Sequence, residues 1–150
     1  MLLADEIRAR GTVVDVERVL RIALLHDWSE TRVGDMPKTA VTYFGSEARR
    51  EAEIGAFADV VKEAGAGSEH YRALYEEYEA RESLEAQIVK AADVIDLLVQ
   101  ALALERGGAR GLDEFWEVAV ADNLTIEGKP REVFKELISE LTEARRALPR

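Results

Sequence analysis

The chain has 150 residues, a formal net charge of −10 and no cysteine. That length allows one domain with a substantial hydrophobic core, and the absence of thiols excludes disulfides, thiolate metal sites and cysteine nucleophiles. The negative charge disfavours non-specific binding to nucleic acid or to anionic membranes, although one divalent metal ion can still attract a small anionic substrate.

The composition also bears on where the protein works. No apolar run approaches the roughly 20 residues that span a bilayer, and the first residues do not resemble a secretion signal, so we expect a cytoplasmic protein. Charged residues make up 33% of the chain and Asn and Gln are scarce, which is typical of thermophiles. Arginine outnumbers lysine, which a GC-rich genome would also produce. A thermophilic source and a GC-rich genome therefore both remain open as explanations of the composition.

Hydrophobic periodicity predicts helices from the first residues onward. The first helix is expected at residues 2–10 and ends at a glycine. The second begins after Asp15, whose side chain can cap it, and runs to about Thr31. A loop containing Gly34 and Pro37 follows.

The rest of the chain is also expected to be helical. Residues 47–63 form a helical pattern with Ile54, Phe57, Val60 and Val61 on its inner face. Further helices are expected at residues 68–81, 84–104, 112–121 and 130–147. No repeat or linker interrupts the pattern, so residues 1–150 are predicted to form one all-α domain, a compact bundle of about six or seven helices.

The longest expected helix follows the capping residue Ser83 and is apolar on nearly every face, so it should be central. Asp93 and Asp96 interrupt it. A buried carboxylate without a partner costs several kcal/mol, so at least one of the two needs a cation. Lys90, one turn before Asp93, can form an ion pair, and a bound metal ion is the alternative.

A second group of polar residues ends the apolar segment 22–25. His26 and Asp27 are adjacent, and Glu30 lies one turn after His26 on a continuing helix. Imidazole nitrogen and carboxylate oxygen suit divalent ions, and a nearby Glu can orient or deprotonate an attacking water. The alternative is a His satisfied at a helix end beside ordinary surface charges. His70, in a charged segment, is predicted to be a solvated surface residue.

Several short motifs stand out together along the first two thirds of the chain. They are His26-Asp27-x-x-Glu30, Gly34-Asp35-Met36-Pro37, Tyr43-Phe44 and Lys90-Ala91-Ala92-Asp93. In combination they resemble the HD-domain metal-dependent phosphohydrolases, and within that family the 5′-deoxynucleotidase branch of YfbR-like and HDDC2-like proteins. The resemblance runs to about residue 104, and the last third follows more loosely.

The resemblance implies a divalent metal ion and its ligands. His26, Asp27 and Asp93 would hold the ion, which could be Mn, Co, Zn, Ni or Mg. The implied reaction is the hydrolysis of deoxyribonucleoside 5′-monophosphates to deoxynucleoside and phosphate. A homodimer is also implied, with a small-molecule nucleotide as partner and neither nucleic acid nor membrane.

The resemblance further implies which residues act on the substrate. Glu30 would align or activate the attacking water, and Glu30 and Asp35 would be the catalytic residues. Asp35, with the loop to Lys38, would contact the sugar and the phosphate.

The chain departs from the family pattern at one point. The family has a further His ligand on an earlier helix, and neither His26 nor His70 can take that place. The first helix starts without a capping residue, which favours a truncated start, while a natural variant that has lost the ligand is the other possibility.

Two other functions stay open. An HD phosphohydrolase for another nucleotide would keep the fold and change the substrate contacts. A degenerate, non-catalytic HD module for dimerisation or ligand binding would explain the missing His, but it would leave the retained Glu30 and Asp35 without a purpose.

Overall fold

The computed structural model describes residues 1–120 and 125–149, without the side chains of residues 38, 39 and 118–120. Every regular element in these ranges is helical, which confirms the predicted all-α fold. The chain divides into two compact units: Met1–Val19 together with Arg81–Arg150, and Leu20–Ala80. Helix α2 (Val16–Leu25) crosses the boundary between them. Across the described ranges, no helix combines the length and the apolar composition needed to cross a membrane.

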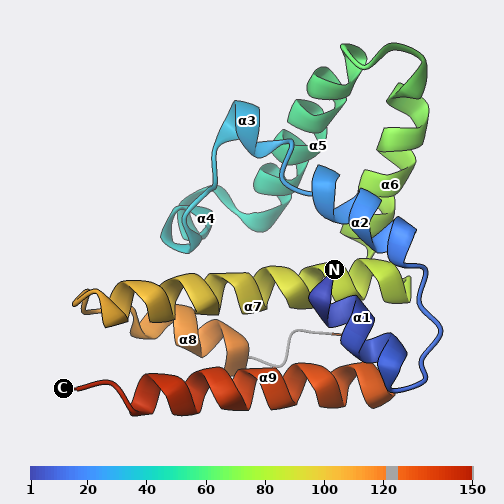
Figure 1. Cartoon of the computed structure of the whole chain (residues 1–150). Coiled ribbons are helices and arrows are strands. Elements are labelled where there is room, and N and C mark those ends of the chain that lie inside the picture. Colours follow the sequence, from blue (N-terminus) through green and yellow to red (C-terminus); the bar gives the residue numbers. More distant parts are fainter. Residues whose placement is uncertain (121–124, 150) are drawn as a thin grey trace. The chain divides into compact units, whose positions relative to one another are not determined.

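The first unit is built on the long helix α7. Its helices are α1 (Leu2–Ala9), α7 (Leu84–Arg106), α8 (Asp113–Val120) and α9 (Gly128–Arg146). Helix α7 packs against each of the other three, and α1 also packs against α9 (Figure 1). The Ser83 hydroxyl accepts a hydrogen bond from the Ala86 backbone N–H at 3.2 Å, so the predicted N-terminal cap of this helix is confirmed.

One hydrophobic cluster in the core of the first unit gathers around Trp116. Its buried members on α7 are Leu98, Ala101 and Leu102, and the half-buried side chains Leu112, Phe115, Ile138, Leu141, Ala144 and Leu148 pack against them. Arg145 covers this cluster from outside: its guanidinium lies 4.8 Å from the Trp116 ring centroid and contacts Glu105 at 2.8 Å and Asp113 at 2.7 Å. One cation therefore ties α7, α8 and α9 together over the core.

Two polar contacts join α1 to α9. The Lys129 ammonium donates to the Arg10 carbonyl at 3.0 Å, at the end of α1 where helix carbonyls lack partners. Arg10 also pairs with Glu136 at 2.6 Å. The N-terminal helix α1 is therefore held against the C-terminal helix α9 by these two contacts.

The second unit contains the remaining described helices. They are α3 (Glu30–Val33), α4 (Lys38–Phe44), α5 (Ser46–Lys62), the 3₁₀ turn η1 (Gly65–Gly67) and α6 (Ser68–Ala80). Helices α5 and α6 run antiparallel, and α3 and α4 pack against α5 (Figure 1). Helix α5 therefore contacts each of α3, α4 and α6.

Aromatic stacking forms the core of the second unit. Phe57 on α5 and Tyr75 on α6 stack with ring centroids 3.9 Å apart and planes 9° apart. Trp28 packs against Phe57 and edge-on against Tyr71, with centroid distances of 6.3 and 6.0 Å. The Tyr75 hydroxyl donates to the buried Ser29 hydroxyl at 3.5 Å. These contacts fix the segment that follows α2 against the α5–α6 pair.

Two boundaries in this unit differ from the sequence-based expectation. Helix α2 ends at Leu25 and does not continue to Thr31, because the backbone changes from i→i−4 to i→i−3 hydrogen bonds from Trp28 onward. Residues 38–44, for which no helix was predicted, form α4. That helix is short and contains β-branched residues, so its periodicity and propensity are both weak.

The inner face predicted for α5 is partly confirmed. Phe57 and Val61 are buried and Val60 is half-buried, but Ile54 is 45% exposed, so its assignment to the inner face was wrong. His70 is exposed, as predicted.

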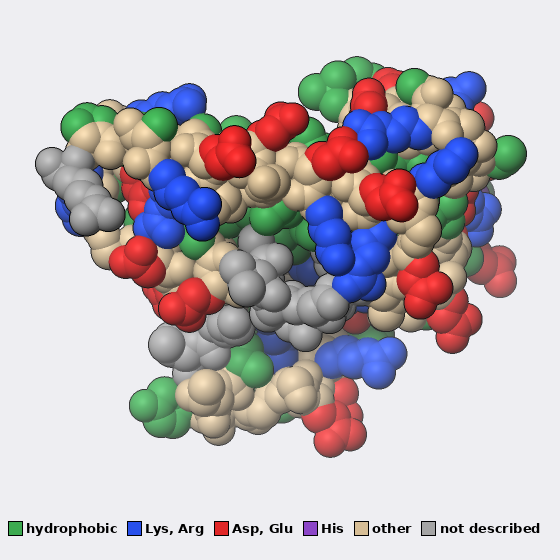
Figure 2. Space-filling view, turned by 90° about the horizontal axis from the view of Figure 1, so that it is seen from below, with side chains coloured by type: hydrophobic (Ala, Val, Ile, Leu, Met, Phe, Trp, Pro, Cys, Tyr) green, Lys and Arg blue, Asp and Glu red, His purple; other side chains and the backbone are tan. Residues whose placement is uncertain are grey.

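Figure 2 shows Lys and Arg side chains interspersed with Asp and Glu, so on this face the net charge of −10 does not form one continuous acidic field.

Candidate metal centre and active site

His26 is the first residue after α2, and its ring is held from two sides. Its Nδ1 lies 2.8 Å from the Ala23 carbonyl oxygen, which can only accept, so Nδ1 carries a hydrogen and donates it. The ring also packs edge-on against Tyr78, with centroids 5.3 Å apart. In the neutral imidazole the lone pair is therefore on Nε2. A backbone carbonyl that orients the ring in this way is a common support for a metal-binding His.

Asp27 lies directly beside that nitrogen. Its Oδ2 is 3.1 Å from His26 Nε2, and its side chain is 58% exposed. Two ligand atoms that are each about 2.1 Å from one ion, at a right angle, are about 3.0 Å apart. In their chemistry and separation, His26 and Asp27 therefore fit as two neighbouring ligands of one divalent ion.

Glu30 and Asp35 follow within the same unit. Glu30 is half-buried and begins α3, while Asp35 is exposed in the segment 34–37 that joins α3 to α4. Gly34 ends α3 with a φ of 71°, a left-handed backbone conformation that glycine adopts without strain. Asp35 is the residue that follows this turn. Lys38 is the first residue of α4, and its side chain lies outside the described residues. Because α2 ends at Leu25, Glu30 is not one helical turn from His26 as the sequence suggested.

Arg49 is a residue of this region that sequence reasoning did not single out. It lies in the first turn of α5, and its Nε–H donates to the Glu53 carboxylate at 2.7 Å. This hydrogen bond raises the pKa of Arg49, and the charges of Asp35 and Glu30 raise it further. Nothing in the spacing distinguishes Arg49 from its neighbour Arg50, so only the folded chain identifies it.

Asp93, the third predicted metal ligand, belongs to the first unit. Its Oδ2 accepts from the Lys90 ammonium at 2.6 Å, and its side chain is 37% exposed. Asp96 accepts from the Gln100 amide at 2.6 Å. The Lys90–Asp93 ion pair, which the sequence offered as the alternative to a bound metal ion, is therefore present. In the part of the chain that the structure describes, no three His, Asp or Glu side chains gather closely enough to hold a metal ion.

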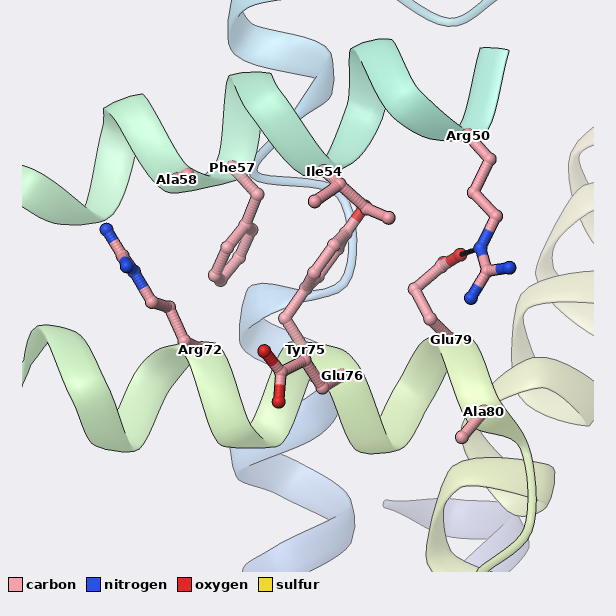
Figure 3. Close-up of a pocket in the computed structure, with 9 residues that line it drawn as sticks. All are labelled: Arg50, Ile54, Phe57, Ala58, Arg72, Tyr75, Glu76, Glu79 and Ala80. Carbon is pink, nitrogen blue, oxygen red and sulfur yellow. Dashed lines mark ion pairs between the residues drawn. The ribbon is translucent and has the colours of Figure 1, made fainter. Parts of the chain in front are cut away.

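A groove in the second unit lies away from the predicted site residues. It has a volume of about 260 Å³ and runs between α5 and α6, over Ile54, Phe57 and Tyr75 (Figure 3). Arg50 and Glu79 form an ion pair of 3.9 Å at one end. Burial raises the pKa of the Tyr75 phenol. None of the predicted ligands or catalytic residues lines this groove.

The helical fold and the His26–Asp27 pair together define a class of protein, an all-α domain with a candidate site for a divalent ion. Residues 1–135 match the HD domain family, and the chain belongs to this family. HD domains generally depend on divalent metal ions, in agreement with the donor chemistry of His26 and Asp27.

Two curated relatives are both 5′-deoxynucleotidases by name. The chain is 33% identical over 105 residues to 5′-deoxynucleotidase HDDC2 of Danio rerio, a match that covers 69% of this chain and 52% of the relative. It is 27% identical over 131 residues to 5′-deoxynucleotidase hdd1 of Schizosaccharomyces pombe, which covers 82% of this chain and 65% of the relative. The chain thus spans about half of the first relative and less than two thirds of the second.

Two solved structures share the fold. A conserved hypothetical protein from Pyrococcus furiosus is 36% identical with a TM-score of 0.73, over 95% of this chain and 74% of that protein. A crystal structure of a Pyrococcus horikoshii protein is 32% identical with a TM-score of 0.75, over 92% of this chain and 75% of that one. Both agree with the all-α architecture.

Proposed function

We propose that this HD-domain chain hydrolyses deoxyribonucleoside 5′-monophosphates to deoxynucleoside and phosphate, with the help of a divalent metal ion. The observation that supports this most is the His26–Asp27 pair, in which an oriented imidazole nitrogen lies 3.1 Å from a carboxylate oxygen. The two relatives named 5′-deoxynucleotidase support the choice of substrate. A homodimer is part of the proposal, and analytical ultracentrifugation tests it.

The proposed roles follow from the chemistry of each side chain. His26, Asp27 and Asp93 would hold the ion, which when bound supplies positive charge to the phosphoryl oxygens. Glu30 would accept a proton from the attacking water, a step that contributes about 10²–10⁴-fold to rate in other enzymes. Asp35 and Lys38 would bind and orient the sugar and the phosphate.

Phosphate release from dAMP and from AMP tests this proposal. With Mn or Co present, we expect release from dAMP, and we expect EDTA to abolish it. If neither nucleotide is hydrolysed under any divalent ion, the proposed reaction is wrong. Hydrolysis of AMP as fast as dAMP would favour an HD phosphohydrolase of broader nucleotide specificity.

The Asp93–Lys90 ion pair favours a second candidate, a non-catalytic HD module. Asp93 already has a cationic partner, so a metal ion is not needed to offset its charge. Metal analysis of the purified chain separates the two proposals, because a non-catalytic module would hold little or no stoichiometric divalent ion. In the catalytic case Asp93→Asn loses metal with little change in melting temperature, whereas Asp96→Asn keeps it.

A further inference from the structure

The groove between α5 and α6 has no part in the proposed reaction, and buried aromatic rings line it. Phe57 and Tyr75 are 2% and 4% exposed and stack with their ring centroids 3.9 Å apart. The Tyr75 hydroxyl donates to Ser29, so both rings already have partners beside the groove, whose volume is about 260 Å³. A groove lined by side chains with fixed partners is largely preformed, which lowers the cost of ordering it when a ligand binds.

An aliphatic side chain in this groove remains in contact with water. Ile54 extends from α5 toward α6 and is 45% exposed (Figure 3). Removing such apolar surface from water is the main favourable contribution to most association. The groove is slightly smaller than the pockets of about 300–1,000 Å³ that hold drug-sized ligands. It therefore suits a small molecule with an apolar body.

The charged side chains of the groove are two arginines and two glutamates, so their charges cancel. Arg50 and Glu79 form the ion pair of 3.9 Å at one end. Arg72 and Glu76 are both exposed on α6, and neither forms an ion pair with any residue that the structure describes (Figure 3). Because these two lie one helical turn apart on the same face, the groove offers one unpaired charge of each sign.

We propose that this groove binds a free α-amino acid with a large apolar side chain, such as phenylalanine or leucine. The ligand carboxylate accepts hydrogen bonds from the Arg72 guanidinium, the ligand ammonium pairs with Glu76, and the ligand side chain covers Ile54. A simple carboxylate would be repelled by Glu76, and a simple amine would be repelled by Arg72, so a zwitterion fits this pair of charges. The inference goes beyond the proposed function, since it uses neither a metal ion nor a nucleotide.

A titration followed by NMR chemical shifts tests this site with three matched probes, without metal or nucleotide. L-phenylalanine should bind the wild-type chain with a dissociation constant on the order of 1 mM. It should shift the backbone amide signals of α5 and α6 around Ile54 and Tyr75. Phenylpropanoate, which lacks the ammonium, and phenylethylamine, which lacks the carboxylate, should each bind about three- to fivefold more weakly.

Variants of single residues assign the two ends of the ligand. Arg72→Gln should weaken phenylalanine binding about three- to fivefold without weakening that of phenylethylamine. Glu76→Gln should weaken phenylalanine binding by a similar factor without weakening that of phenylpropanoate. Ile54→Ala should weaken all three probes, because each places its ring on this side chain. The matched controls are Arg49→Gln on α5 and Glu69→Gln on α6, which lie outside the groove lining and should bind all three probes as the wild-type chain does.

Three results would overturn the inference. The first is the absence of shifts in α5 and α6 at about ten times the expected dissociation constant of phenylalanine. The second is phenylalanine binding that survives unchanged in both Arg72→Gln and Glu76→Gln, which places the ligand elsewhere. The third is phenylpropanoate binding as tight as that of phenylalanine. Phosphate release from dAMP is measured separately, so the proposed reaction and the amino-acid site can each fail while the other holds.

Discussion

In the unit formed by α1, α7, α8 and α9, opposite charges are paired across helices that are distant in sequence, as in Arg145 with Glu105 and Arg10 with Glu136. In the Leu20–Ala80 unit, by contrast, His26, Asp27 and the following carboxylates are crowded into the segment 26–35. The first arrangement stabilises helix packing, because each charge has a partner of opposite sign. The second places acidic residues along one short stretch of sequence, where His26 Nε2 lies 3.1 Å from Asp27 Oδ2.

The two units also differ in how they are packed. The first buries aliphatic side chains of α7 around Trp116, whereas the second stacks Phe57 and Tyr75 beneath the segment that carries His26 to Glu30. Trp28, the residue after Asp27, packs against Phe57 of this stack. Every predicted site residue except Asp93 lies in the second unit, and each of the following experiments tests whether stability and chemistry divide between the units in the same way.

The largest expected effect is on activity and comes from Glu30→Gln. This change keeps the shape of the side chain but removes the proton acceptor, so kcat for phosphate release should fall by about 10²–10⁴-fold. The melting temperature should change little, since Glu30 is only half-buried at the start of α3. The control is Glu114→Gln, an exposed glutamate of α8 in the other unit, which should keep wild-type kcat. Equal kcat losses in both variants would contradict the division.

Phe57→Ala should cause the largest loss of stability in the second unit. The side chain is 2% exposed and stacked on Tyr75, so its removal leaves a cavity and should cost about 3–5 kcal/mol of unfolding free energy. Urea denaturation measures this cost. Ile54→Ala, three residues earlier on α5 and 45% exposed, is the control and should cost less than about 1 kcal/mol. Similar costs for the two would mean that the aromatic stack does not form the core of this unit.

Arg145→Gln should destabilise the first unit by a smaller amount. The change leaves Glu105, whose side chain is 10% exposed, without its bidentate partner and removes the cation above Trp116, at a cost of about 1–3 kcal/mol. Chemical denaturation measures the stability, and nucleotide hydrolysis should be unchanged in the fraction that remains folded. A fall in kcat/KM without a fall in stability would show that Arg145 itself takes part in the chemistry.

The smallest expected effect concerns pH and the Arg10–Glu136 pair. A hydrogen bond from Arg10 lowers the pKa of Glu136 below its ordinary value of 4.5. A lowered carboxyl pKa stabilises the folded state above the unfolded pKa, and this stabilisation is lost as the pH falls through the folded pKa. Thermal melts should therefore show Glu136→Gln slightly less stable than wild type above about pH 5, with the difference vanishing in more acidic buffers. A difference that grows on acidification would have the wrong sign for this pair. Glu140→Gln, on the same helix, serves as the control.

The sequence by itself determined the helical class, the family and several helix beginnings. Asp15 caps α2 through the Arg18 backbone N–H at 3.0 Å, and Ser83 caps α7, because a cap depends on residues three positions apart in the chain. The HD motif with its following Glu and Asp identified the family for the same reason, since the residues that carry it lie close together in sequence.

Only the tertiary structure decided which side chains meet. The end of α2 at Leu25 accompanies the contact of Ser29 with Tyr75, a residue far along the chain, and it separates Glu30 from the helical position that its spacing suggested. The pairing of Arg145 with Glu105 and Asp113, and of Arg10 with Glu136, likewise follows from packing. Local spacing determines helix periodicity and caps, but electrostatic partners depend on distances that the chain acquires only when its helices pack.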